Sequence, residues 1–259
     1  MVIRFINFVG STTLKLCTQL GEFSLFFIHS IRILFTTRLK IVKLFYQMNR
    51  IGVESFNIMV LTGSFAGMVF AMQSYIGFQR VGGEQFIGTI VALGMIRELG
   101  PVLTGLMVTG RAGSAITAEI GTMRITEQID ALRTLRINTF QYLVIPRILA
   151  GIIILPFLSL FAMICGIIGG YFINTYVLEL SPEDYINGIK NFVDIKDITG
   201  GLTKASVFGL ILTWVATYKG FFTHGGARGV GVATTESVVA SSMLILIANY
   251  FLTKMLEHL

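Results

Sequence analysis

The chain has 259 residues, of which 54% are hydrophobic and only 13% are charged, and its mean hydropathy is +0.77. A soluble domain carries about 25% charged residues, so this composition excludes an ordinary soluble protein. Several apolar runs of spanning length instead predict an all-α integral membrane protein, with one polytopic domain over residues 55–259. The net charge of +6 does not indicate a nucleic-acid partner, because the basic residues flank apolar segments rather than forming a separate patch.

Residues 1–54 are basic and aromatic, with seven Lys or Arg residues against Glu22 and Glu54. We interpret them as amphipathic helices that lie in the membrane interface and turn their basic side chains towards anionic headgroups. The alternative is a first spanning helix across Phe23 to Phe35, which Arg32 and the short length disfavour. The residues expected to face the headgroups are Arg32, Arg38, Lys40, Lys43 and Arg50.

The segment from Ser55 to Gln79 contains no charged residue and predicts the first transmembrane helix. Its 25 residues would measure about 37 Å as a helix, which is enough to cross a bilayer with some tilt. Gly63 and Gly67 form a GxxxG motif, a small-residue face that lets another backbone approach closely. We expect this face to pack at a dimer interface, although the motif is also common by chance in glycine-rich membrane helices.

The second span, Gln85 to Gly110, carries Arg97 and Glu98 near its midpoint. A charge at the bilayer centre costs about 2.5 to 3.5 kcal/mol, so such residues usually face a cavity or a partner. Neighbours on a helix point about 100° apart, so these two need partners elsewhere, and Lys204 is the candidate for Glu98. Pro101 removes the hydrogen bond to the Arg97 carbonyl, which predicts a kink and a freed acceptor. The alternative to a functional site is a buried ion pair that only holds helices together.

The next segment, residues 111–147, is polar, with five arginines and three acids. Thr126 can cap a short helix whose first turns are acidic and whose end is basic, the order that suits the helix dipole. An amphipathic helix in a loop, within residues 119–136, is therefore predicted, and spacing alone favours a helix resting on the membrane surface. Its apolar face would consist of Ile125, Ile129, Leu132 and Leu135.

Three further spans are predicted over Ile148 to Leu178, Gly201 to Tyr218 and Ser237 to Thr253. The loop between the first two of these, Glu179 to Gly200, is the only acidic region. If the N-terminus and the loops 111–147 and 219–236 are cytoplasmic, 14 Lys and Arg residues lie on that side. The positive-inside rule then places the acidic loop and the C-terminus outside.

Several chemistries find no support in the sequence. There is no GxxxxGK[ST] phosphate loop and no HExxH motif, and the three histidines lie far apart without paired carboxylates. Cys17 and Cys165 have no metal-ligand spacing and are interpreted as small core residues. No helix shows a polar stripe along its length, which disfavours a channel. We therefore expect neither an enzyme nor a bound metal.

The stretch from Glu98 to Leu132, ELGPVLTGLMVTGRAGSAITAEIGTMRITEQIDAL, closely resembles the signature of the MlaE/YrbE family. These proteins are permease subunits of ABC transporters that move phospholipids between the two membranes of Gram-negative bacteria or between plastid envelope membranes. The resemblance implies a homodimer that pairs with a cytoplasmic ATPase, which binds the ATP, and with an MCE-domain lipid-binding protein on the far side. No cofactor is then expected in this chain itself.

The resemblance also assigns roles to particular residues. Arg97 and Glu98 match positions that line a lipid pocket between the protomers, and Lys204 lies where the family also has a charged residue. We expect Lys204 and Pro101 to belong to the same pocket. The loop helix would be the coupling helix that a groove in the ATPase receives. The coupling residues would be Glu119, Arg124, Glu127, Asp130 and Arg133.

A transit peptide is not recognisable, which favours a multi-pass protein of the bacterial inner membrane over a plastid envelope protein. The rival function is a non-transporting scaffold that anchors the lipid-binding protein to the membrane. The direction of transport and the preferred lipid headgroup stay open.

Overall fold

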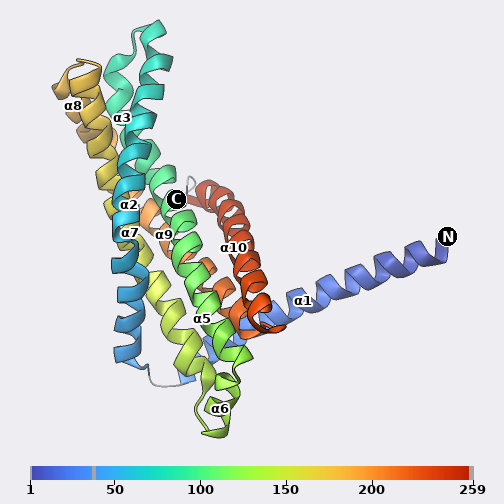
Figure 1. The fold of residues 1–259 in the computed structure, drawn as a ribbon. Coiled ribbons are helices and arrows are strands. Elements are labelled where there is room, and N and C mark those ends of the chain that lie inside the picture. Colours follow the sequence, from blue (N-terminus) through green and yellow to red (C-terminus); the bar gives the residue numbers. More distant parts are fainter. Residues whose placement is uncertain (1, 37–38, 257–259) are drawn as a thin grey trace.

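The computed structural model describes residues 2–36 and 39–256. Within these ranges the chain forms helices and no strands, which confirms the expected fold class. Five segments are long and apolar enough to cross a membrane, and they form an elongated bundle (Figure 1). Their bounds are Ile41–Phe78, Glu84–Ile125, Phe140–Val177, Ile195–Phe221 and Gly226–Leu256.

The N-terminal helix α1, Val2–Thr36, is not one of the five spans and projects sideways from one end of the bundle (Figure 1). Aromatic rings hold its second half against the bundle. The Phe23 ring stacks on Trp214 with ring centroids 4.1 Å apart, and the Phe26 ring lies 5.0 Å from that of Phe140. This placement suits an interfacial helix, which stays a prediction. Arg38, one of the residues expected to face headgroups, lies outside the described residues.

Helix α2, Ile41–Phe78, begins 14 residues before the expected start of the first span at Ser55. The helix that contains the first span therefore includes the last 14 residues of the segment that was expected to lie in the interface. Charged residues led to an interfacial assignment for the segment before Ser55, but the bundle provides partners for two of them. Arg50 pairs with Glu119 at 2.6 Å, and Glu54 pairs with Arg111.

The glycine face of α2 packs inside the same chain, against α7 (Ile145–Phe172). A Cβ atom at Gly63 would lie 2.6 Å from the carbonyl oxygen of Ala162, and one at Gly67 would lie 1.9 Å from that of Gly166. The expectation that these two glycines form a dimer interface is therefore wrong. The motif does mediate close backbone approach, but the sequence could not say which helix approaches.

Substituting Gly67 should destabilise the bundle, because an added methyl group would displace one backbone from the other. We expect Gly67→Ala to cost at least about 1–3 kcal/mol, the usual range for overpacking, and to lower the yield of monodisperse protein in detergent. Gly77→Ala in the same helix is the control, because a Cβ atom there has no neighbour within 4 Å. Equal yields of the two variants would contradict this account of the α2–α7 contact.

The second span runs without a break in helical structure from η2 (Glu84–Phe86) to Ile125. It comprises α3 (Ile87–Gly94), α4 (Gly100–Val108) and α5 (Ser114–Ile125), joined by the π-helical segments η3 (Met95–Leu99) and η4 (Thr109–Gly113). The prediction that the chain becomes a loop after Arg111 is therefore wrong. Arg111 stays in the helix because its guanidinium donates 2.8 Å to the Ser55 hydroxyl and also pairs with Glu54.

The short helix expected in the loop exists as α6, Gln128–Thr134, but it does not begin as predicted. The Thr126 hydroxyl donates to the Thr122 carbonyl at 2.8 Å, at the end of α5, and so does not cap α6. Glu127 breaks the helix instead, because its backbone is left-handed at φ 59°. Of the predicted apolar face, Ile129 is fully buried while Leu135 is 70% exposed.

The remaining spans are longer than expected, and the loops are correspondingly shorter. The third comprises η5 (Phe140–Val144), α7 and η6 (Ile173–Val177), and it is followed by α9 (Ile195–Phe221) and α10 (Gly226–Leu256). In the acidic loop, α8 (Pro182–Phe192) packs on α3 through Tyr185, whose hydroxyl donates to the Ile167 carbonyl at 3.0 Å. Burial raises the pKa of Tyr185, so it remains a neutral donor.

Candidate functional site

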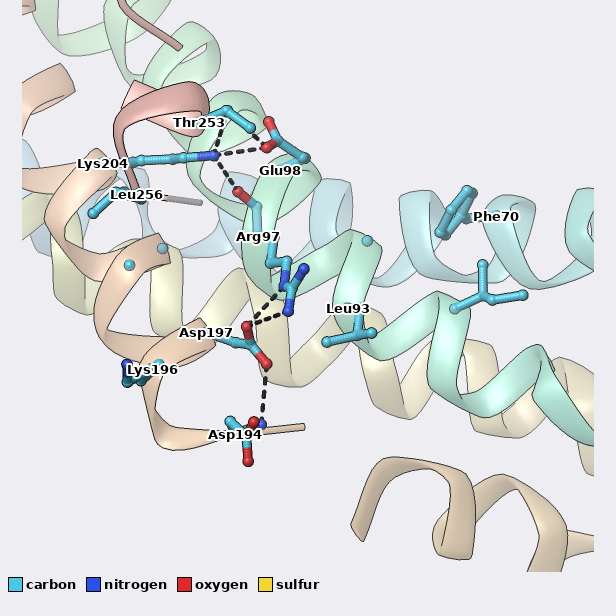
Figure 2. A pocket seen from close by; sticks show the side chains of 14 residues that line it. Phe70, Leu93, Arg97, Glu98, Asp194, Lys196, Asp197, Lys204, Thr253 and Leu256 are labelled. Atoms are coloured by element: carbon cyan, nitrogen blue, oxygen red, sulfur yellow. Dashed lines mark hydrogen bonds and ion pairs between the residues drawn. The ribbon is translucent and has the colours of Figure 1, made fainter. Parts of the chain in front are cut away.

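A cavity of about 680 Å³ opens between α2, α3, α9 and the end of α10 (Figure 2). One part of its wall is apolar and includes Phe70, Ile90 and Leu93. The other part is charged and comes mainly from η3 and the first turns of α9. Its ionisable residues are Arg97, Glu98, Asp194, Lys196, Asp197 and Lys204.

Backbone geometry brings α9 against the π-helical segment η3. A Cβ atom at Gly201 would lie 2.3 Å from the carbonyl oxygen of Ile96, so only glycine permits this approach. Lys204, almost one turn further along α9, then donates at 2.8 Å to the Arg97 carbonyl. Pro101 has no N–H to offer that carbonyl, so the predicted free acceptor exists and a side chain from another helix uses it.

Glu98 contacts side chains from two other helices (Figure 2). Lys204 Nζ lies 2.7 Å from Glu98 Oε1, which confirms the predicted pairing. From α10, the Thr253 hydroxyl donates to the same oxygen at 2.9 Å, and Asn249 Nδ2 donates to Oε2 at 2.8 Å. Because the Lys204 side chain is only 4% exposed and that of Glu98 is 37% exposed, the lysine depends on this pair more than the glutamate does.

Arg97 pairs with Asp197, a residue that the sequence analysis did not select. Arg97 Nε donates to Asp197 Oδ1 at 2.7 Å, and the second carboxylate oxygen accepts from the Asp194 backbone N–H at 3.0 Å (Figure 2). Asp197 therefore has two roles: one carboxylate oxygen fixes the start of α9, and the other neutralises the charge of Arg97. Its position seven residues before Lys204, two turns earlier on one helix face, would have indicated it if α9 had been predicted to begin at residue 195.

Three of the four predicted pocket residues, Arg97, Glu98 and Lys204, thus lie together at the cavity. Pro101 does not line it: this residue is buried in α4, and its effect on the pocket is through the freed carbonyl. Within the described ranges, no three His, Cys, Asp or Glu side chains are grouped so as to hold a metal ion. A cavity with a charged wall and an apolar wall suits a molecule that has a charged head and an apolar tail.

The predicted coupling residues lie in α5, in α6 and between them, towards the Ile125 end of the second span. Arg124 of α5 binds both carboxylate oxygens of Asp130 at 3.0 Å, which braces α6 against α5. Arg133 approaches the same carboxylate at 3.2 Å from within α6. Glu127 is exposed at the break between the helices. Glu119 lies inside α5 rather than in a loop helix, where Arg50 and Arg147 bind its carboxylate.

The fold and the cavity together define a class of protein. It is a multi-pass helical membrane protein in which the second span connects an amphipathic cavity to the protruding helix α6, as in a transporter permease. Residues 44–255 match the family described as Permease MlaE. The chain is 42% identical to a probable ABC transporter permease protein of Rickettsia bellii, over 98% of each chain. It is 34% identical to the intermembrane phospholipid transport system permease protein MlaE of Haemophilus influenzae, over 98% of this chain and 97% of that one. The chain therefore belongs to the MlaE permease family.

Proposed function

We propose that this protein is the membrane-spanning subunit of an ABC transporter that moves phospholipids between the inner and outer membranes of a bacterium. The observation that carries the proposal is the cavity, whose charged wall suits a headgroup and whose apolar wall suits acyl chains. Family membership supports the same substrate class, since one relative is named for intermembrane phospholipid transport. The chain would reside in the inner membrane, with its α6 end in the cytoplasm.

A separate ATPase subunit would bind the ATP and dock on α6. Leu135 supports this docking, because a leucine that is 70% exposed at the end of a short, braced helix offers an apolar contact to a partner groove. Arg133 in the same helix and Glu127 at its start are also exposed and would add polar contacts. Binding energy released at α6 would then act along the continuous second span, which carries Arg97 and Glu98 near its middle.

Two further partners complete the proposal. A second copy of the chain would cover α10, because only 17% of the residues in its most apolar stretch are buried and Met243, Ile247 and Tyr250 are exposed. An MCE-domain lipid-binding protein would receive or deliver lipid at the α8 end. These assignments follow the family resemblance, and the α10 surface supports the first of them.

The test is purification of the protein in detergent together with its ATPase, followed by analysis of bound lipid. We expect stoichiometric ATPase and co-purified phospholipid, whereas a scaffold would show neither. Leu135→Asp should remove most of the ATPase without lowering membrane abundance, because the side chain is already exposed. Ile186→Asp, an exposed apolar residue on α8 at the other end, is the matched control and should retain the ATPase.

A further inference from the structure

A second cluster of charges joins three helices at the α6 end of the bundle. Arg50 of α2 contacts Glu119 Oε2 at 2.6 Å, and Arg147 of α7 contacts Glu119 Oε1 at 3.2 Å. Each carboxylate oxygen thus binds a guanidinium from a different helix. Glu119, which lies in α5, therefore fastens α5 to α2 and α7 at once.

This cluster lies on the mechanical path between α6 and the cavity. Glu119 lies less than two turns before Ile125, where α5 ends and the braced α6 unit follows. In the other direction α5 continues through η4 and α4 to η3, which carries Arg97 and Glu98. If α6 is displaced, the movement must therefore be transmitted along the helix past Glu119 before it reaches the cavity.

The two helices that Glu119 contacts behave as one unit. The close backbone contacts of Gly63 and Gly67 with α7 leave no gap between α2 and α7 and oppose sliding of one helix past the other. The carboxylate of Glu119 therefore forms a joint between this α2–α7 unit and the long second span, because it binds both helices of the unit, whereas the Glu54–Arg111 pair links only α2 to the span. If the second span moves relative to the α2–α7 unit, the ion pairs of the Glu119 carboxylate must lengthen or change partners.

The hydrogen-bond donors of this joint are only partly satisfied, which favours a change of hydrogen-bond partners. The Arg147 side chain is 4% exposed, yet no protein group that the structure describes accepts from its Nε. Two guanidiniums share one carboxylate, so the cluster has more donors than acceptors. A buried polar network with unused donors can exchange partners, whereas an apolar contact at this place would simply resist movement.

From this geometry we infer that Glu119 is a positioning residue that transmits movement of α6 to the cavity, rather than a direct contact of the ATPase. The inference rests on the proposed function, because it requires an ATPase that acts on α6. Glu119 sets how the second span moves relative to the α2–α7 unit. Its loss should separate ATP hydrolysis from lipid movement while leaving the partners assembled.

The experiment compares reconstituted full complexes that contain the unsubstituted chain, Glu119→Gln or Arg50→Gln. Glu54→Gln is the matched control, because its carboxylate also links α2 to the second span but is 51% exposed and contacts neither arginine of the joint. The measured quantities are ATPase subunits per permease, ATP hydrolysis and lipid moved per ATP. Arg50→Gln keeps the pair between Glu119 and the buried Arg147, so it tests the joint even if Glu119→Gln folds poorly.

We expect Glu119→Gln to keep ATPase stoichiometry and to lower lipid moved per ATP about tenfold, within the usual range of coupling between sites. Arg50→Gln should lower the same ratio less, and Glu54→Gln should leave it unchanged. Loss of ATPase from an otherwise abundant Glu119→Gln protein would overturn the inference in favour of direct contact. An unchanged ratio in both joint variants would show a purely structural role. If the unsubstituted complex holds no ATPase, the proposed function itself fails.

Discussion

Glu98→Gln should reduce lipid transport on the order of tenfold or more, because it leaves the ammonium group of Lys204 without a counter-ion in a site where that side chain is only 4% exposed. Lys204→Met should be less damaging, since the Glu98 side chain is 37% exposed and keeps hydrogen bonds from Asn249 and Thr253. Adding Lys204→Met to Glu98→Gln should restore part of the loss, because no unpaired charge then remains.

The measurement is lipid transfer in reconstituted vesicles with the two single variants and the double variant side by side. Lys190→Met, which removes an exposed lysine of α8 outside the cavity, is the control and should transport normally. If both charges instead contact the lipid headgroup independently, the double variant will be at least as defective as either single one. Full activity of Glu98→Gln would show that this mid-membrane charge has no role in transport.

Asp197→Asn should produce the second large effect, through Arg97. An asparagine oxygen can still accept from the Asp194 N–H, so the start of α9 is retained, but the negative charge beside Arg97 is lost. Charge-assisted hydrogen bonds contribute about 1.5–3 kcal/mol, and Arg97 is half exposed, so we expect a loss of about fivefold rather than the larger effect of Glu98→Gln. The unpaired guanidinium should also shift the bound lipids towards anionic headgroups.

Transport and the ratio of anionic to zwitterionic lipid in the purified protein would both be measured. Glu183→Gln serves as the control, because this exposed acid of α8 lies outside the cavity. An unchanged lipid ratio together with normal transport would mean that the Arg97–Asp197 pair only holds α9 to η3. A loss of folded protein would point to the helix start instead, and Asp197→Glu would then separate charge from geometry.

Two glycine-rich contacts show where prediction from the sequence stopped. The GxxxG motif of Gly63 and Gly67 was recognised as a surface for close approach, which depends only on side-chain size along one helix. Its partner proved to be α7 of the same chain, and Gly201 makes the corresponding approach to η3. Which two helices meet depends on the whole arrangement of the bundle, so no local pattern contains it.

The charged residues show the same limit of prediction from the sequence. Arg50 was assigned to the membrane interface, and Arg111 and Arg147 to a loop, because a charge normally ends a membrane span. Each is instead held in a helix by a carboxylate from a distant part of the chain, which lengthens the spans and shortens the loops. Asp197 was overlooked for the same reason, since its partner Arg97 is 100 residues away.

The sequence by itself determined the membrane class, the five spans, the family and the special character of the Arg97 to Pro101 segment. Hydropathy, a missing proline N–H and a contiguous motif are local properties, and they persist in any fold. Only the tertiary structure decided which helix the glycines meet, that Asp197 pairs with Arg97 at the cavity, and which carboxylates hold Arg50, Arg111 and Arg147 within helices. Those outcomes depend on helix neighbours and on burial, where a charge is tolerated only if an opposite charge from another helix arrives at the same depth.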